Sequence, residues 1–279
     1  MKLDSVTLDE LLADQRPIET GRFDLTRTEF VSPSGLVGLA IAVEVAADVT
    51  DKVTIVVGDA SLRTYLARSR FLAEVDTLCS IEPPVSSNAA HSFDHRVGRS
   101  PMLIELTRIG STSDLEDVLD RTVEALTRRL RFPRGEAFGA ATLLSEVGAN
   151  VLEHGGGRGL VALQVYGDGA GRFLEIGIGD AGPGIRKALA TNPTLRRTAS
   201  DTHAILEAVR HGVSSFQEPT RGVGLYHFLR FTSEHSGWAQ IRSGAGKVRW
   251  RGDKGARWTF TVADLAGALI SLGLPAKDG

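Results

Sequence analysis

Three short polar motifs in the second half of the chain constrain its fold most strongly, because each has a fixed place on a predicted helix or strand. Glu146, Asn150 and His154 recur every four residues on a predicted helix, so they project from the same side of it. Residues 180–184 directly follow an apolar strand, and residues 221–224 open a further helix. A chain that alternates helices and strands around such motifs is expected to fold as an α/β (α+β) protein.

Apolar periodicity predicts the remaining elements. Residues 36–47 are apolar almost all round, which predicts a buried helix, and the β-branched run 52–57 predicts a buried strand. Further strands are expected at 102–106, 159–166, 173–179, 239–243, 247–251 and 257–262, and further helices at 62–71, 115–130, 136–154, 204–211 and 224–234. Residues 81–99 shift to Pro, Ser, Asn and His, as in a linker. We therefore expect two α/β domains, residues 1–98 and residues 99–279.

Charge and composition narrow the classes of partner. The formal net charge of −2 over 279 residues gives no electrostatic footprint for nucleic acid or an anionic membrane, so neither is an expected partner. Cys79 is the only cysteine, which excludes an intrachain disulfide and a cysteine-based metal site. The acidic N-terminal segment lacks the apolar core of a signal peptide. The apolar run 36–47 contains Glu44 and falls short of the roughly 20 residues of a membrane-spanning helix. We expect a soluble, cytoplasmic protein.

Each motif has a structural interpretation as well as a functional one. Glu146 and Asn150 either form the solvated face of an amphipathic helix or point into a site. Asp180 and the glycines after it either form an ordinary turn or bind a ligand. A carboxylate at the end of a strand, beside glycines that allow close approach, can accept a hydrogen bond from an exocyclic amino group. It would favour adenine over a 6-oxo purine, whose lone pair would face the carboxylate.

The third motif, residues 221–224, has the same two interpretations. Gly222 and Gly224 at the start of a helix present free backbone N–H groups and the positive end of the helix dipole, which suit phosphate oxygens. The same Gly-x-Gly pattern also occurs as a plain helix-capping turn.

Taken together, the three motifs resemble the GHKL ATPase superfamily, which includes gyrase, histidine kinases and MutL. Its members carry a Glu-xxx-Asn N box, an Asp-x-Gly-x-Gly box and a Gly-x-Gly-Leu box in this order. The resemblance covers about residues 101–262 and includes a lid-like pattern at residues 204–205, 212–215 and 221–222. The strand–helix–N-box order is also similar to the anti-sigma-factor serine kinases. The resemblance implies a GHKL (Bergerat-type) α/β sandwich domain that binds ATP and Mg²⁺.

The resemblance also implies roles for individual residues. Glu146 would be the catalytic residue, acting as a general base toward water or a substrate hydroxyl or orienting it. Asn150 would offer its amide oxygen to Mg²⁺. Asp180 would bind the adenine amino group above the turn formed by Gly182 and Gly184. The implied nucleotide-binding residues are Asn150, Asp180, Gly182, Gly184, Ile185, Arg221, Gly222, Val223, Gly224, Leu225 and Thr259.

One position departs from the family pattern. The closing strand of the family usually carries Gly-Thr, with the threonine near the adenine-binding aspartate. Here Gly255 is followed by Ala256, so the hydroxyl either comes from Thr259 or is missing.

Residues 23–39 resemble the STAS fold of anti-sigma-factor antagonists, over about residues 20–80. Pro33 stands where the family's phosphorylated serine would lie, and Ser34 either replaces that serine or caps the following helix. The resemblance implies that the N-terminal domain, STAS-like and small, is an interaction or sensing module for a protein partner.

Three functions follow as hypotheses. The first is a Mg-ATP-binding regulatory protein in which ATP binding or slow hydrolysis switches the interaction with a protein partner. The second is a protein serine/threonine kinase of the anti-sigma-factor type, and the third is a non-catalytic ATP-sensing adaptor. A histidine kinase is disfavoured, because the predicted helix at 115–130 contains no histidine. The sequence does not fix the oligomeric state, and a homodimer is one option.

Overall fold

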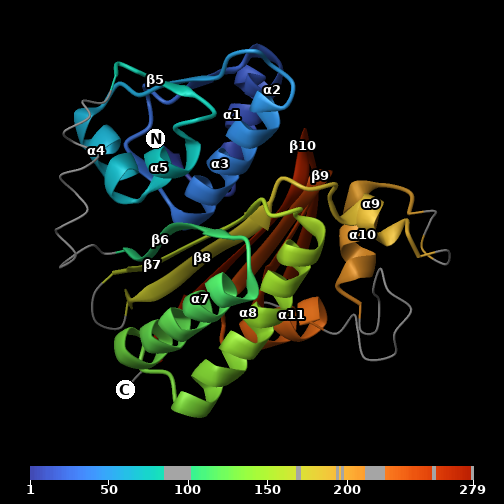
Figure 1. The fold of residues 1–279 in the computed structure, drawn as a ribbon. Coiled ribbons are helices and arrows are strands. Elements are labelled where there is room, and N and C mark those ends of the chain that lie inside the picture. Colours follow the sequence, from blue (N-terminus) through green and yellow to red (C-terminus); the bar gives the residue numbers. More distant parts are fainter. Residues whose placement is uncertain are drawn as a thin grey trace.

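The computed structural model describes residues 1–84, 102–167, 171–192, 195, 198–210, 224–252 and 256–277. The chain is a mixed α/β protein with several sheets (Figure 1). Its elements in chain order are β1 (Lys2–Leu3), α1 (Thr7–Gln15), α2 (Pro17–Thr20), β2 (Arg22–Asp24), β3 (Phe30–Val31), α3 (Pro33–Ala47), β4 (Thr54–Val56), α4 (Ala60–Arg68), α5 (Phe71–Val75), β5 (Ser80–Glu82), β6 (Met102–Ile109), α7 (Thr112–Glu124), the π-helix η1 (Ala125–Arg129), α8 (Arg134–His154), β7 (Gly159–Tyr166), β8 (Phe173–Asp180), α9 (Ile185–Leu189), α10 (Asp201–Ala208), α11 (Gly224–Glu234), β9 (Trp238–Arg251) and β10 (Ala256–Pro275).

The largest sheet has five strands in the order β6-β7-β8-β10-β9, and all neighbouring strands run antiparallel. Helices α7, α8 and α11 lie on one face of this sheet (Figure 1), where their apolar side chains join those of the strands in one buried cluster. Leu115, Val118 and Leu126, whose spacing predicted a helix, are buried in that cluster. The helical stripe therefore forms the interface that holds α7 against the sheet.

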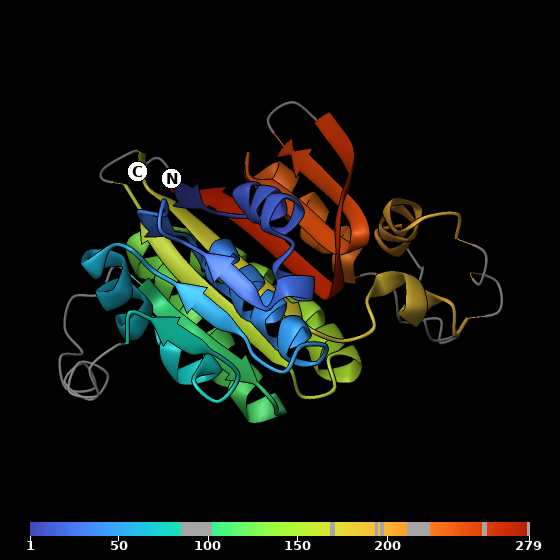
Figure 2. The same ribbon diagram turned by 90° about the horizontal axis from the view of Figure 1, so that it is seen from above.

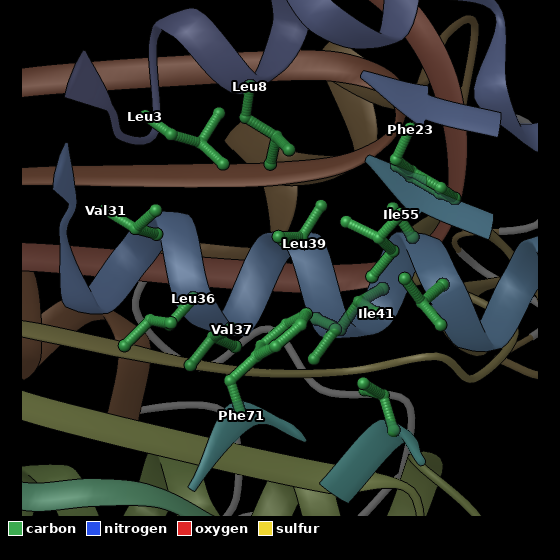
Figure 3. Close-up of a cluster of buried hydrophobic side chains, with 14 of the residues drawn as sticks. Leu3, Leu8, Phe23, Val31, Leu36, Val37, Leu39, Ile41, Ile55 and Phe71 are labelled. Atoms are coloured by element: carbon green, nitrogen blue, oxygen red, sulfur yellow. The ribbon is translucent and has the colours of Figure 1, made fainter. Parts of the chain in front are cut away.

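Helix α3 lies on the opposite face of the same sheet, and a three-stranded parallel sheet in the order β2-β4-β5 covers its other side (Figures 1 and 2). Figure 3 shows side chains from α1, β2 and β4 gathered around α3. All but two residues of α3 are buried, as the apolar run 36–47 predicted. The molecule is thus layered as sheet, helix, sheet and helices, and α3 is enclosed between two sheets.

The first turn of α3 packs closely against strand β8. At Gly177 a Cβ atom would lie 2.7 Å from the Cα of Ser34, so this contact requires glycine. Ser32 caps α3, its Oγ accepting the Gly35 N–H, which corrects the assignment of the cap to Ser34. The Ser34 hydroxyl is buried and donates to Glu175 of β8 at 2.6 Å, and Ser32 donates to the same carboxylate at 2.7 Å. A buried carboxylate therefore lies at the positive end of the α3 dipole.

Strand β9 reverses direction at residues 244–246, which we call the β9 turn. Its two ends lie side by side, because the Gly252 N–H donates to the Gly237 carbonyl at 2.8 Å. The strands predicted at 239–243 and 247–251 are the two halves of β9 on either side of this turn. Strand β10 follows around it: Thr261 lies opposite Gly246, and Leu265 lies opposite Gly244.

The prediction that the last strand ends near residue 262 was wrong. Strand β10 continues to Pro275, and its second half is inserted between β8 and β9. Residues 263–275 are rich in Ala, Leu and Gly and contain a single β-branched residue, Ile270, so their local sequence carries little strand signal. Pairing on both sides makes this segment a strand in spite of its low propensity.

The predicted domain boundary at residue 98 lies outside the described residues. On either side of it, the first 84 residues and the five-stranded sheet contribute to one buried cluster, which contains Leu39 and Ile41 as well as Leu160 and Leu269. Within the described part of the chain, no helix combines the length and apolar character needed to cross a membrane.

Candidate functional site

Helix α8 presents Glu146 and Asn150 away from the core. Leu144, Val147 and Val151 of the same helix are buried toward the sheet, so the positions between them face outward, and Glu146 and Asn150 are exposed. In the described part of the chain, neither side chain forms a hydrogen bond or ion pair.

The amino end of α11 lies directly against Glu146. A Cβ atom at Gly224 would lie 2.6 Å from the Cβ of Glu146 and 3.2 Å from its Oε2, so only glycine fits without displacing that side chain. Leu225, the next residue, packs against the buried cluster beneath α8 and α11. The described part of α11 thus begins beside Glu146.

The turn after β8 packs against the carboxyl end of α8. The Gly182 N–H donates to Asp180 Oδ1 at 2.8 Å, which closes the turn. A Cβ atom at Gly182 would overlap the His154 carbonyl oxygen and lie 2.7 Å from Asp180 Oδ1. Asp180 and the last residue of α8 are therefore neighbours, and His154 ends the helix as predicted.

A serine on β9 holds the other side of this turn. The Ser243 Oγ accepts the Ile185 N–H at 2.9 Å and donates to the Gly267 carbonyl at 2.9 Å. Gly184, which precedes Ile185, has φ +82°, and a Cβ atom there would lie 2.8 Å from Ser243 Oγ. Ser243 thereby joins the start of α9 to β10.

Burial controls the charge of Asp180. Its side chain is 5% exposed, and this burial raises the pKa of the carboxyl to about 6, against the lowering effects of the Gly182 N–H and the nearby Arg158. Arg158 also donates to the Ala181 carbonyl at 2.7 Å and pairs with Asp48 at the end of α3 at 2.6 Å. Asp180 Oδ2 accepts no hydrogen bond from the residues that the structure describes, so it can accept one from a ligand.

One predicted site residue, Thr259, does not lie opposite Asp180. Thr259 is exposed on the first half of β10 opposite Val248, whereas the residue opposite Asp180 is Ala268. Thr259 is therefore not the hydroxyl next to Asp180, because β10 runs nine residues further before it reaches β8. Arg221, Gly222 and Val223 lie outside the described residues.

Sequence reasoning missed Ser243, Gly267 and Arg158. None of them belongs to a local motif, because each reaches the turn after β8 from a different strand or loop. The one available signal was the Gly-Ala-Gly run that follows Ser243, which marks a tight turn next to it.

The chain matches no known protein-family model, and no curated protein shows significant sequence similarity to it.

The raised pKa of Asp180 predicts how stability depends on pH. In the unfolded chain this carboxyl ionises near its ordinary pKa of 3.8, whereas the folded protein keeps it protonated up to a pKa of about 6. Between these values the folded state holds more protons, so its stability falls as the pH rises. We expect Asp180→Asn, which cannot ionise, to gain roughly 3 kcal/mol relative to the wild type between about pH 4 and about pH 7. Urea unfolding at each pH measures this difference.

The exposed residue Asp51 provides the control for this experiment. Asp51→Asn should leave the pH profile of the unfolding free energy nearly unchanged. Identical profiles for the Asp180 and Asp51 variants would contradict the buried position of Asp180.

Proposed function

We propose that this chain is a GHKL-type regulatory protein that binds Mg-ATP, and that ATP binding or slow hydrolysis switches its interaction with a protein partner. The observation that carries the proposal is the convergence of three segments far apart in the sequence. The amino end of α11 lies on Glu146, and the turn after Asp180 lies on the last residue of the same helix, α8. One elongated site along α8 would then take the base at one end and the phosphates at the other.

The buried carboxylate of Asp180 fits an adenine ring. Its Oδ1 is occupied by the Gly182 N–H, and its Oδ2 can accept the exocyclic amino group. A carboxylate so buried discriminates strongly, because a 6-oxo group would leave it facing a second acceptor. Above its pKa of about 6 it is ionised and accepts fully.

The start of α11 fits the phosphates. This helix begins at Gly224 and is long enough to carry a dipole, and its free N–H groups and positive end attract anions. Asn150, one turn beyond Glu146 on α8, would hold Mg²⁺ through its amide oxygen together with phosphate oxygens and water, and the ion would neutralise phosphate charge. Glu146, exposed beside Gly224, would accept a proton from water or from a substrate hydroxyl, or orient it.

The architecture supports the proposal of a GHKL-type fold. An antiparallel sheet with α7, α8 and α11 on one face and the site at the helix side is compatible with a GHKL sandwich. The N-terminal unit would be STAS-like, with α3 starting at the Ser-Pro-Ser-Gly segment. Because Ser34 is buried against Glu175, we propose that this unit acts through its packing on the sheet and not through phosphorylation of Ser34.

Isothermal calorimetry with ATP and GTP tests the nucleotide assignment. We expect ATP to bind and GTP not to bind. Asp180→Asn should weaken ATP by about 1–3 kcal/mol, the range for loss of a charged hydrogen bond. In Asn150→Ala the extra affinity that Mg²⁺ gives ATP should be lost, while ADP without metal should bind nearly as before.

The outcomes of this experiment are distinct. GTP binding as tight as ATP would overturn the role of Asp180, and a full Mg²⁺ effect in Asn150→Ala would remove Asn150 from the metal site. Incubation with labelled ATP and a cell lysate then separates the functional classes. Free phosphate indicates an ATPase, a labelled lysate protein a kinase, and binding with neither an adaptor.

A further inference from the structure

Helix α10 packs against the start of α9 and the start of α11. Ala204 and Ala208 of α10 form a small buried cluster with Leu189 of α9, and Ile185 and Leu225 pack against it. Ile185 directly follows Gly184, and Leu225 directly follows Gly224. The position of α10 therefore fixes the distance between the turn after β8 and the start of α11.

The amino end of α10 is attached to the β9 turn. The Ala245 N–H donates to Asp201 Oδ2 at 3.0 Å. A Cβ atom at Gly244 would lie 2.7 Å from the same oxygen, and one at Gly246 would lie 2.6 Å from the Asp201 carbonyl carbon. Gly244 and Gly246 thus leave room for Asp201 because they carry no side chains, and we call the space between them the socket.

Helix α1 of the N-terminal unit is attached to the same turn from the other direction. Arg242, just before the turn, donates to Asp9 Oδ1 at 2.8 Å, and Lys247, just after it, pairs with the other Asp9 oxygen. The side chains of Arg242, Lys247 and Asp9 are 2%, 7% and 10% exposed. Arg242 also donates to the Gly244 carbonyl at 3.1 Å, so its position sets the geometry of the socket itself.

The charges in this cluster make the attachment sensitive to Asp9. Two buried cations share one carboxylate, with the Lys247 ammonium also lying 5.0 Å from the centre of the Phe260 ring. Among the residues that the structure describes, no other carboxylate pairs with Arg242 or Lys247. Removing the Asp9 carboxylate therefore carries a large penalty, which movement of the β9 turn would relieve.

We propose that Asp201 is a positioning residue for the nucleotide site, and that the N-terminal unit controls it through Asp9 and the β9 turn. Asp9 of α1 and Asp201 of α10 are both attached to the β9 turn. The turn thereby positions α10, which packs against the start of α9 and the start of α11. The inference rests on the proposed ATP site and names its regulation. A change in how α1 sits on β9 alters nucleotide affinity without contact between α1 and the nucleotide.

Two variants with matched controls test this coupling. Asp9→Asn is compared with Glu10→Gln, which changes the next residue of α1, an exposed one. Asp201→Asn is compared with Glu207→Gln, because the ion-pair partners of Glu207, His203 and Arg210, lie within the same segment of the chain. Each protein is measured by hydrogen exchange of the peptide that contains the β9 turn, without nucleotide, and by calorimetry with Mg-ATP. Both aspartate variants should exchange faster at the turn and bind ATP about fivefold or more weakly, within the usual range of coupling between sites.

Two results would overturn the proposal in a wild type that binds ATP. One is unchanged exchange at the β9 turn in Asp9→Asn. The other is an Asp9→Asn/Asp201→Asn double variant whose losses of affinity simply add, because residues acting through one turn must not be independent. A merely structural role would speed exchange at the turn through lower stability but leave the ATP affinity of the folded protein unchanged, and that result would also overturn the proposal.

The design also covers two complications. If Asp9→Asn does not fold, Asp201→Asn alone decides, because reciprocal coupling requires faster exchange in α1 as well as in the turn. If the wild type binds no ATP, the proposed function fails, while the exchange measurement still shows whether Asp9 and Asp201 share the turn. Unchanged exchange in α1 for Asp201→Asn contradicts the coupling in either case.

Discussion

Glu146→Gln should bind ATP as the wild type does and turn it over about 10²–10⁴ times more slowly, the usual contribution of general-base catalysis. The carboxylate is exposed on α8 beside Gly224 and forms no bond in the described part of the chain, so the fold does not depend on its charge. In the proposed mechanism its interaction with the attacking water or hydroxyl strengthens only in the transition state, so the loss would fall on the rate constant for turnover. Phosphate release under saturating Mg-ATP measures the turnover, and calorimetry measures the binding.

Glu153→Gln, on the same helix and also exposed, is the control and should keep the wild-type rate. A Glu146→Gln protein that hydrolyses ATP or transfers phosphate at the wild-type rate would remove Glu146 from the chemistry. If the wild type itself does neither, the chain is an ATP-sensing adaptor and the carboxylate serves another purpose.

Gly267→Ala should lower the free energy of unfolding by roughly 2–5 kcal/mol, as overpacking and backbone strain act together. Gly267 has φ +89°, and a Cβ atom there would overlap the backbone oxygen of Asp180 and lie 2.8 Å from its carbonyl carbon. The added methyl group must push β10 away from the end of β8. Because Asp180 moves with that end, ATP affinity should fall as well.

Gly139→Ala supplies a control of opposite sign. This glycine lies within α8 and a Cβ atom there meets nothing within 4 Å, so alanine should raise stability by about 0.5–1 kcal/mol through its better helix propensity. Urea unfolding of both variants provides the measurement. Wild-type stability for Gly267→Ala would contradict the pairing of β10 with β8.

The parts of the fold that local patterns encode could be predicted from the sequence. The helical spacing around Glu146 predicted α8 to within two residues at its start, and the glycine after Val223 marked the first residue of α11. The apolar run 36–47 predicted a buried helix because it is apolar almost all round, with Glu44 as its one charged residue. In each case the determining residues are neighbours in the chain.

The parts that failed depend on pairing between distant segments. Thr259 was one of two alternatives for the hydroxyl near Asp180, because the sequence cannot tell which residues of a long strand pair with β8. The answer, Ala268, follows from the path of β10 around the β9 turn. Likewise the hydrogen bond from Arg242 to Asp9 joins residues 233 positions apart, and no local sequence pattern near either residue predicts it.

Enclosure of α3 between two sheets limits how this chain can be dissected. A fragment that starts at residue 102 would expose Leu160, Ala162 and Leu269, which the N-terminal unit now covers, and would leave Glu175 without its two serine donors. Such a fragment presents a bare apolar sheet face to water and is prone to self-association. The N-terminal unit and the five-stranded sheet should therefore evolve together. Recombination between homologous genes at the predicted linker would pair two packing surfaces that did not evolve against each other.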